Sequence, residues 1–294
     1  MLLAAIDIGS NASRLLFANV FQSERRILVE KATLVRIPTR LGEDVYKTGF
    51  ISPVKEENLI KTLMAYKLLL EVYQPAAYDA CATAAMREAS NGGEVLEHAI
   101  RETGIPIRMI NGEEEASIIR RTNKLDLHEN NKPVMYIDVG GGSTDISIIS
   151  DGKILGVKSF KIGTLRHLSG KVSDLEWKSL KKWLKNFSEH FGNMRCIGSG
   201  GNINKINKIY GDTERYMLTF KALKRAFKHL DGFTLEERIE KMGLRPDRAD
   251  VIVPAAAIFI FIMKTIEADL IYVPKTGLAD GLVHQLFEHQ TKSL

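Results

Sequence analysis

Two aspartates in this chain each stand directly before a glycine-containing turn, in segments that resemble each other. Asp7 lies in residues 4–17, which read AAIDIGSNASRLLF, and Asp138 lies in residues 135–148, which read MYIDVGGGSTDISI. A glycine turn at the end of a strand lets backbone N–H groups approach a phosphate, because no side chain blocks them. A carboxylate beside such a turn can hold Mg²⁺, which prefers oxygen ligands. The recurrence of the pattern in each half of the chain predicts a pair of phosphate-binding β-hairpins.

Each of these features also has a purely structural interpretation. A glycine loop can be only a tight hairpin turn, and each aspartate can cap its own turn through a side-chain hydrogen bond. Two equivalent copies, with a further glycine pair at Gly200 and Gly201, favour the phosphate-binding interpretation. The loop over residues 140–144 is the best suited of them, since its glycines expose the backbone and its hydroxyl groups add donors.

Acidic and basic side chains elsewhere could take part in the same chemistry. Three successive glutamates at positions 113–115 follow Gly112 at the predicted start of a helix. The helix dipole favours acidic side chains there by about 0.3–1 kcal/mol, which accounts for them without chemistry; a general base is the alternative. Arg87 lies between a predicted strand and a helix, and its planar guanidinium suits a phosphate. An ion pair with Glu88 or Glu94 is the structural alternative.

The elements that position these residues alternate between strands and helices. A Ser-Pro pair at residues 52–53 predicts a helix start, and Ser/Thr-x-x-Glu patterns from Ser173 and Thr234 predict two capping boxes. A hairpin at the start of each half, followed by alternating elements, predicts two α/β domains with mixed sheets. We expect the boundary within residues 121–132, where no low-complexity linker marks it. The predicted helices cover residues 54–73, 113–121, 175–191 and 234–243, and the predicted strands cover 78–83, 105–110 and 195–197.

The composition is that of an ordinary globular protein with a mild excess of positive charge. The 294 residues are 45% hydrophobic and carry a net charge of +5, which suits an anionic partner as well as a solvated surface. The two cysteines lack metal-site spacing and favour a reducing, cytoplasmic compartment. Basic runs on predicted helices form either a solvated face or a basic approach to an anion. They are Lys178, Lys181, Lys182 and Lys185, and Lys221, Lys224, Arg225 and Lys228.

Several classes of protein are disfavoured. Residues 1–6 are apolar but lack a basic n-region, so we expect a strand and no signal peptide. Residues 251–263 contain Pro254 and are too short for a membrane span of ~20 residues, so we expect a buried helix. The chain lacks zinc-site spacing, a Walker loop, the Rossmann fingerprint and a Gly-x-Ser-x-Gly elbow. We expect neither a membrane nor a nucleic-acid partner.

The ordered motifs resemble those of the exopolyphosphatase/guanosine pentaphosphate phosphohydrolase (Ppx/GppA) family. Any one of these loops is a weak signal, but the set in this order along the chain is a strong one. The resemblance implies two ribonuclease-H-like, actin-like α/β domains, each with a mixed sheet flanked by helices, and an active-site cleft between them. The matching segments are residues 7–11 (DIGSN), 82–89 (ATAAMREA), 111–116 (NGEEEA), 138–145 (DVGGGSTD), 198–202 (GSGGN) and 243–250 (GLRPDRAD).

The resemblance also implies a domain division and a reaction. The N-terminal domain would span residues 1–121 and the C-terminal domain residues 122–280, and a final helix at about 281–292 would pack back on the N-terminal domain. The reaction would release orthophosphate from the ends of polyphosphate, or the 5′ terminal phosphate of pppGpp. The ligand would accordingly be polyphosphate or a guanosine penta- or tetraphosphate, and the protein would form a homodimer.

Roles for individual residues follow from the same resemblance. Glu115 would be the general base, and Asp138 and Asp145 would complete the catalytic set. The cofactor would be Mg²⁺, held by Asp7, Asp138 and Asp145. The phosphate-binding residues would be Ser10, Asn11, Arg14, Arg87, Gly140, Gly141, Gly142, Ser143, Gly200, Gly201 and Asn202.

The chain departs from the family pattern in four places. Ala12 stands where the family usually has Ser or Thr, so a phosphate-binding hydroxyl is lost or is replaced by Ser13. Asp145 stands where most members have Glu, so this shorter carboxylate shifts the metal or reaches it through water. Ala279 replaces an Arg in the near-terminal motif at residues 277–281. The chain also stops near the two-domain length, and we expect no HD-like domain.

Two other classes of function compete with a hydrolase. A sugar or acetate kinase could use the same fold, because functional sites are grafted on folds, but the sequence shows no separate acceptor motif. A filament subunit or a non-catalytic regulator that binds (p)ppGpp is the third alternative, and the departures at Ala12 and Ala279 keep it open. The sequence leaves the choice between polyphosphate, pppGpp and another nucleotide undecided.

Overall fold

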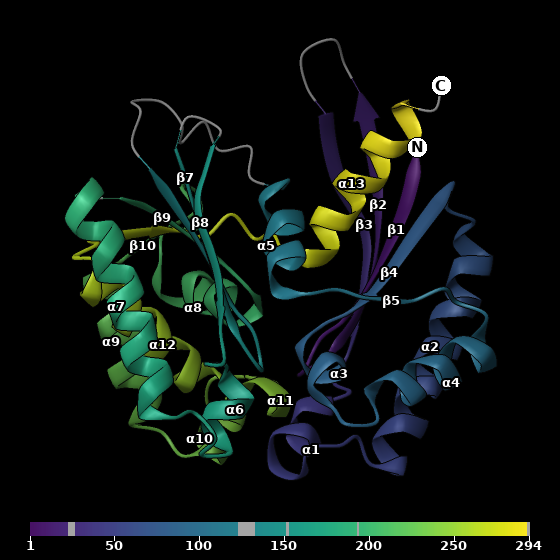
Figure 1. Ribbon diagram of the computed structural model, residues 1–294, viewed down its shortest axis with the longest axis horizontal. Coiled ribbons are helices and arrows are strands. Elements are labelled where there is room, and N and C mark those ends of the chain that lie inside the picture. Colours follow the sequence, from purple (N-terminus) through teal and green to yellow (C-terminus); the bar gives the residue numbers. More distant parts are fainter. Residues whose placement is uncertain (23–26, 123–132, 151–152, 193, 293–294) are drawn as a thin grey trace. The chain divides into compact units, whose positions relative to one another are not determined.

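The chain divides into two compact units, each built on one mixed β-sheet with helices on its flanks (Figure 1). The computed structural model describes residues 1–22, 27–122, 133–150, 153–192 and 194–292. The first unit comprises Met1–Thr122 and Gly277–Leu294, and the second comprises Asn123–Thr276. The predicted α/β class, with two mixed sheets flanked by helices, is confirmed.

The sheet of the first unit has the strand order β3-β2-β1-β4-β5. The first three strands form an antiparallel meander, and β4 and β5 run parallel to β1. Because the carboxyl ends of parallel strands meet at one edge, the turns after β1, β4 and β5 gather at that edge. The strands are β1 (Leu2–Ile8), β2 (Ser13–Gln22), β3 (Ile27–Ile37), β4 (Ala77–Ala82) and β5 (Arg108–Met109).

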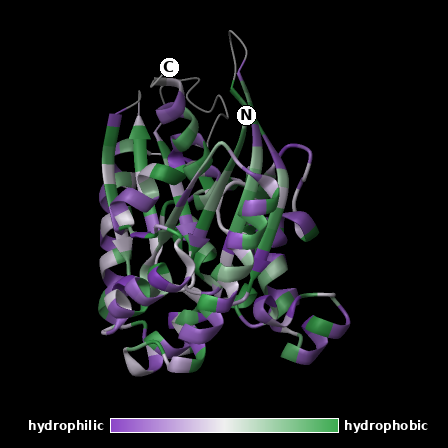
Figure 2. Cartoon of the chain, turned by 90° about the vertical axis from the view of Figure 1, so that its right-hand side faces the viewer, coloured by the Kyte–Doolittle hydropathy of each residue, from purple (hydrophilic) through white to green (hydrophobic). Residues whose placement is uncertain are grey.

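Helices cover both faces of this sheet. α13 (Leu278–Lys292) and α5 (Gly112–Arg120) pack on one face, where their apolar side chains join Leu3, Ala5 and Leu16 in a single cluster. α2 (Pro53–Tyr73) packs on the opposite face, where the Tyr73 ring stacks on Phe17 at 4.1 Å between centroids. The remaining helices of this unit are α1 (Leu41–Thr48), α3 (Ala84–Glu88) and α4 (Gly92–Thr103). In Figure 2 the strands are mostly hydrophobic in colour, whereas the helices alternate between hydrophobic and hydrophilic residues.

The sheet of the second unit repeats this arrangement and adds one strand. Its order is β10-β11-β9-β6-β7-β8, with an antiparallel meander of β6, β7 and β8 and with β9 parallel to β6. The segment β8-β7-β6-β9-β11 therefore corresponds to β3-β2-β1-β4-β5 of the first unit. The strands are β6 (Val134–Val139), β7 (Thr144–Ser150), β8 (Lys153–Phe160), β9 (Arg195–Ser199), β10 (Met217–Thr219) and β11 (Leu270–Tyr272).

The larger core of the second unit lies between one face of this sheet and its helices. The face carries Met135, Ile137 and Val139 of β6, which alternate with residues of the opposite face as a strand requires. α12 is nearly all apolar and is buried over most of its length, as predicted for residues 251–263. The helices are α6 (Thr164–Leu168), α7 (Asp174–Phe191), α8 (Gly201–Tyr210), α9 (Phe220–Asp231), α10 (Leu235–Glu240), α11 (Pro246–Ala249) and α12 (Ile252–Thr265).

Two details of the predicted elements were wrong. The strand expected over residues 105–110 is reduced to Arg108–Met109, because β4 offers it partners only at Cys81 and Ala82. The capping box at Thr234 is confirmed, but the one at Ser173 is only half formed. There the Glu176 carboxylate accepts instead from the Lys161 amide at 3.3 Å.

Within the described residues, no helix has the length and apolar character needed to cross a membrane.

Candidate active site

In the first unit, the predicted phosphate turn connects β1 to β2 in a hairpin. The Gly9 amide donates to the Ala12 carbonyl at 3.1 Å, which makes a four-residue turn between the strands. Asp7 and Arg14 are opposite each other in the ladder, and Arg14 Nη1 lies 2.6 Å from Asp7 Oδ2. Asp7 is buried, and its carboxylate accepts a charge-assisted hydrogen bond from Arg14 within its own hairpin. The two residues predicted as metal ligand and phosphate ligand are thus partners of one another.

The backbone of this turn is braced by the start of α1. The Ser10 carbonyl accepts from the Gly42 amide at 2.8 Å, and the Asn11 carbonyl accepts from the Arg40 amide at 3.2 Å. The Ser10 hydroxyl is buried and lies 2.8 Å from the Tyr46 hydroxyl. A hydroxyl group has one donor and two acceptor sites, so Ser10 can accept from Tyr46 and still donate to an anion.

Ser13 does not replace the hydroxyl that is missing at position 12. Its side chain is fully buried and its Oγ lies 3.1 Å from Thr39 Oγ1, inside the sheet. Its carbonyl accepts from the Tyr66 hydroxyl at 2.9 Å. Burial raises the pKa of Tyr66, and the negative charge of Asp7 raises it further. The phenol therefore stays protonated and donates. The burial of Ser13 and its pairing with Thr39 do not favour it as a phosphate contact.

Arg87 reaches the same edge of the sheet from α3. The chain leaves β4 at Thr83, whose amide donates to the Ile8 carbonyl at 3.1 Å. This bond sets α3 beside the end of β1. Arg87 Nη1 then donates to the Ile110 carbonyl at 2.6 Å, on the segment that leads into α5. This bond ties the motif at residues 82–89 to the start of the motif at residues 111–116. The guanidinium has five N–H donors in all, so others can still bind a ligand.

The three glutamates of α5 lie in three different environments. Glu113 is exposed, and Glu114 is paired with Arg108, which also holds Asp79 at 3.0 Å. Only Glu115 is buried, with 8% of its surface exposed. Asn111 begins the helix by accepting from the Glu114 amide at 2.9 Å. The structure therefore separates one buried acid from two that have ordinary surface roles.

Glu115 and Asp7 both act electrostatically on Cys81. Cys81 is the register partner of Asp7, and its thiol is fully buried. Burial raises the pKa of this thiol well above its usual value, and the negative charges of Asp7 and Glu115 raise it further. Both carboxylates therefore lie within electrostatic range of the Cys81 sulfur, at the carboxyl edge of the sheet.

In the second unit, the glycine loop between β6 and β7 is held by the start of α6. The Gly140 carbonyl accepts from the Thr164 amide at 3.0 Å, and the Gly141 carbonyl accepts from the Leu165 amide at 2.8 Å. The Gly142 carbonyl accepts from Arg166 Nε at 2.8 Å. These bonds orient the loop carbonyls toward α6.

The other side of the loop is made of amide groups. Among the described residues, none accepts a hydrogen bond from the amides at positions 141–143. Consecutive N–H groups of this kind form an anion-binding nest. Gly163 makes the close approach of α6 possible, since a Cβ there would lie 2.3 Å from the Gly142 carbonyl carbon. The loop is therefore held through its carbonyls, and its amides at positions 141–143 make no hydrogen bond to the described residues.

Two carboxylates stand beside this loop. Asp138 and Asp145 are direct partners in the β6–β7 ladder, so both project from the same face. Asp138 Oδ1 accepts from Ser199 Oγ at 2.6 Å, and Asp145 Oδ2 accepts from Ser143 Oγ at 2.9 Å. The Ser143 hydroxyl thus donates to the Asp145 carboxylate, whereas a phosphate contact was predicted for it.

The pair has the donor chemistry that Mg²⁺ requires. Magnesium is usually bound through one or two carboxylates, with water and phosphate oxygens completing its shell. Within the described part of the chain, no cluster of three or more His, Cys, Asp or Glu side chains could hold a metal ion alone. A metal at Asp138 and Asp145 would therefore need substrate oxygens or water, whereas Asp7 is engaged by Arg14.

A second set of amides opens α8. β9 ends at Ser199, and Gly200 takes a positive φ of 107° as the residue before the helix. A Cβ at Gly200 would lie 3.1 Å from the Val139 carbonyl oxygen and 3.3 Å from Asp138 Oδ1, so only glycine fits here without displacement. The amides of Gly201 and Asn202 begin the helix close to Asp138, where helix-start N–H groups favour anions.

Each unit thus gathers its own set of predicted residues at the carboxyl edge of its sheet. The residues that sequence reasoning missed are Gly163, Arg166 and Ser199, which support the glycine loop and Asp138. The strand–glycine–helix transition at Gly163 was the available signal for the first two. The first unit holds Asp7, Ser10, Asn11, Arg14, Arg87 and Glu115, and the second holds Asp138, Gly140, Gly141, Gly142, Ser143, Asp145, Gly200, Gly201 and Asn202.

Comparison with known proteins decides the family. Residues 29–290 match the Ppx/GppA phosphatase family. The chain belongs to this family. The resemblance inferred from the ordered motifs is therefore confirmed, and membership supports a phosphatase function.

Individual relatives agree with this assignment. An exopolyphosphatase structure from Cytophaga hutchinsonii shares 21% identity and a TM-score of 0.83 over 98% of each chain, which shows a common fold. The structure of the Aquifex aeolicus Ppx/GppA family member shares 26% identity and a TM-score of 0.75, covering 99% of this chain and 98% of that one. A bifunctional 3-dehydroquinate synthase/phosphatase from Fusobacterium nucleatum is 27% identical over 98% of this chain. The chain spans about half the length of that relative (47%).

Proposed function

We propose that this Ppx/GppA family protein hydrolyses a terminal phosphoanhydride bond and releases orthophosphate, from inorganic polyphosphate or from the 5′ end of pppGpp. The observation that carries the proposal is the glycine loop of the second unit. Its carbonyls are bound by α6, its amides make no hydrogen bond to the described residues, and two paired carboxylates stand beside it. An anion with several oxygens is the ligand that such a loop suits.

The residues of the chain have distinct tasks in this reaction. The amides at positions 141–143 and at the start of α8 would bind phosphate oxygens, and Arg87 would add a planar donor. Bound Mg²⁺, held by Asp138 and Asp145, would neutralise charge on the phosphate oxygens. Glu115 would orient water and accept its proton. The water oxygen would form the new P–O bond while the bridging P–O bond breaks and its electron pair leaves with the shortened product.

Side-by-side measurements of phosphate release test this proposal. Long polyphosphate, tripolyphosphate, pppGpp and ATP would each be incubated with the protein, in Mg²⁺ and in EDTA. We expect release from at least one of the first three substrates, and loss of that release in EDTA. Ligand binding without phosphate release would contradict hydrolysis and favour the regulator. ADP formation from ATP only with an added acceptor would favour the kinase.

A further inference from the structure

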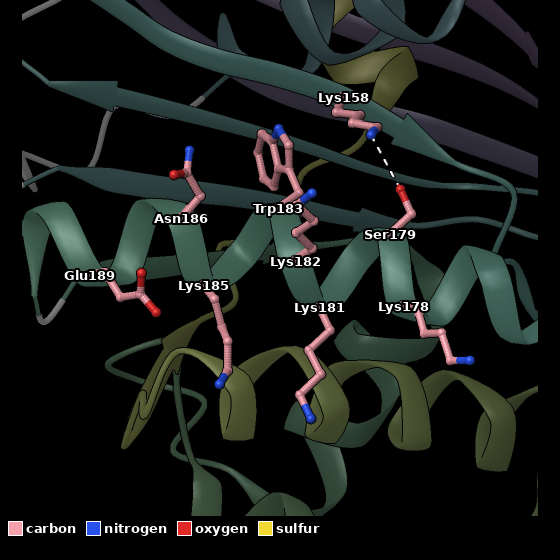
Figure 3. Close-up of a pocket in the computed structure, with 9 residues that line it drawn as sticks. All are labelled: Lys158, Lys178, Ser179, Lys181, Lys182, Trp183, Lys185, Asn186 and Glu189. Carbon is pink, nitrogen blue, oxygen red and sulfur yellow. Dashed lines mark hydrogen bonds between the residues drawn. The ribbon is translucent and has the colours of Figure 1, made fainter.

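A groove between α7 and the edge strand β8 gathers five lysines (Figure 3). It has a volume of about 840 Å³ and contains one acidic side chain, Glu189, among its lining residues. Its lysines are Lys158 of β8 and Lys178, Lys181, Lys182 and Lys185 of α7. None of the described acidic side chains forms an ion pair with the four lysines of α7. The groove therefore carries a net excess of positive charge.

The spacing of the α7 lysines places them in a row along the helix. Residues three and four positions apart are neighbours on a helix surface, and seven residues rise by ~10 Å. All four α7 lysines are exposed, and Figure 3 shows Lys178, Lys181 and Lys185 projecting from the same side of α7. A linear anion lying along the helix could meet these charges in succession.

The floor of the groove is firmly packed. Lys158 Nζ donates to Ser179 Oγ at 3.3 Å and lies 5.0 Å from the centre of the Phe160 ring. Trp183 packs against Phe160 at 5.7 Å and against Phe187 at 4.7 Å between ring centroids. The side of α7 that faces Lys158 is therefore already ordered without a ligand, and Lys178, Lys181 and Lys185 project from the other side of the helix (Figure 3).

The sheet separates this groove from the candidate phosphate site of the same unit. Lys158 is the partner of Ile146, which faces the helix-covered core, whereas Asp145 is the partner of Ser159. Adjacent residues of a strand point to opposite faces, so Lys158 and Asp145 lie on opposite sides of the sheet. A ligand in the groove would not touch the phosphate at Asp145 unless it were long enough to pass the sheet edge at β8.

We propose that the α7–β8 groove binds the distal part of a linear inorganic polyphosphate chain. This inference rests on the proposed function, because it assigns the groove to the polymeric substrate. Lysine ammonium groups act as point charges and suit a uniform chain of phosphates. Single-stranded nucleic acids also need aromatic faces on which bases stack, but Trp183 is half-buried between two phenyl rings. The groove therefore favours a polyanion without bases.

Equilibrium binding of end-labelled long polyphosphate tests the groove. The test variant changes Lys178, Lys181, Lys182 and Lys185 to Gln. The control variant changes Lys221, Lys224, Arg225 and Lys228 of α9 to Gln and removes the same formal charge from another exposed helix. Fluorescence anisotropy is measured at several salt concentrations, with chain length checked on a gel, and phosphate release from tripolyphosphate is measured in parallel.

We expect the α7 variant to weaken binding of long chains about tenfold or more at low salt. The slope of log affinity against log salt should fall by roughly 3, since about 0.7 is lost for each phosphate contact on a single strand. The α9 control should bind long polyphosphate with an affinity within about twofold of the unchanged protein. Phosphate release from tripolyphosphate should be equal in the unchanged protein and both variants. Equal weakening by both variants, or none by either, would overturn the proposal.

Two further outcomes distinguish polyphosphate binding in the groove from nucleic-acid binding and from the proposed hydrolysis. A single-stranded oligonucleotide that binds as tightly as polyphosphate, with the same loss in the α7 variant, would overturn it in favour of nucleic acid. Binding of long polyphosphate that depends on α7, without phosphate release from long polyphosphate, tripolyphosphate or pppGpp by the unchanged protein, would support the groove and contradict the proposed hydrolysis.

Discussion

Glu113, Glu114 and Glu115 share a side-chain type but not an environment. Successive residues of a helix point about 100° apart, so three in a row face three directions. One side chain is exposed to solvent, one pairs with Arg108, and one is buried within electrostatic range of Cys81. Position on the helix, and not residue type, therefore singles out Glu115 as the candidate base.

Glu115→Gln is expected to lower kcat by ~10²–10⁴, the usual contribution of a general base, while leaving thermal stability and ligand binding nearly unchanged. Glu113→Gln is the matched control, since it makes the same chemical change two positions away on an exposed side chain. Phosphate release from the best substrate is the measurement. A Glu115→Gln protein with full turnover, or a Glu113→Gln protein with equal loss, would remove Glu115 from this role.

At the scale of elements, α6 supports the glycine loop rather than forming part of it. The helix is only Thr164–Leu168, but its first amides and Arg166 bind three successive loop carbonyls. Gly163 lets the helix approach because it has no side chain. The orientation of the loop amides, and so the anion site, depends on a contact between segments about twenty residues apart in sequence.

Gly163→Ala should disrupt this contact, because the added methyl would overlap the Gly142 backbone. Displacement of the loop by about 1 Å should lower kcat/KM by ~10²-fold. Gly93→Ala in α4 is the control, since an added Cβ there meets nothing within 4 Å. Steady-state kinetics and thermal unfolding of both variants check the prediction. Normal kcat/KM in a folded Gly163→Ala protein would show that the loop does not position the phosphate.

At the scale of the whole molecule, each unit contains one free cysteine in a central strand. Cys81 lies in β4 of the first unit, and Cys196 lies in β9 of the second. Burial raises the pKa of Cys196 to about 12, and that of Cys81 is also raised. Only the thiolate is an effective nucleophile, so both cysteines are unreactive while their units stay folded. They are independent reporters of the two units.

Labelling with a thiol reagent at pH 8 should be at least ~10³-fold slower in the native protein than in guanidinium chloride, because a stability of ~5 kcal/mol or more rarely exposes the core. Raising the pH from 7 to 9 should speed labelling in the native protein and in guanidinium chloride by a similar factor, because in both cases the exposed thiol reacts with its ordinary pKa. Mass spectrometry identifies which thiol reacts. Rapid labelling of Cys81 alone would show that the first unit opens by itself.

The raised thiol pKa values also make a contribution to stability that depends on pH. The unfolded thiols titrate near 9, and the folded Cys196 thiol titrates near 12. The contribution is therefore fully present below about pH 9 and is lost as the pH rises toward 12.

The sequence by itself determined the two hairpins, most helix starts and the family, because glycine turns, caps and apolar periods act over a few residues. It also located the loops that end β1, β4, β6 and β9, and with them nearly every candidate site residue. The strand over residues 105–110 and the capping box at Ser173 were misjudged because distant partners decided them. The expected cleft, the homodimer and the choice of substrate stay predictions.

Tertiary structure alone decided which partners the site residues have. The pairing of Ser199 with Asp138, of Arg166 with the glycine loop and of Ser13 with Thr39 joins residues 61, 24 and 26 positions apart. Strand register and helix packing bring such residues together, and no local pattern encodes either one. The same register places the lysine groove and Asp145 on opposite faces of one sheet. The residue types therefore indicated the kind of chemistry, whereas the fold decided which residues form hydrogen bonds with one another.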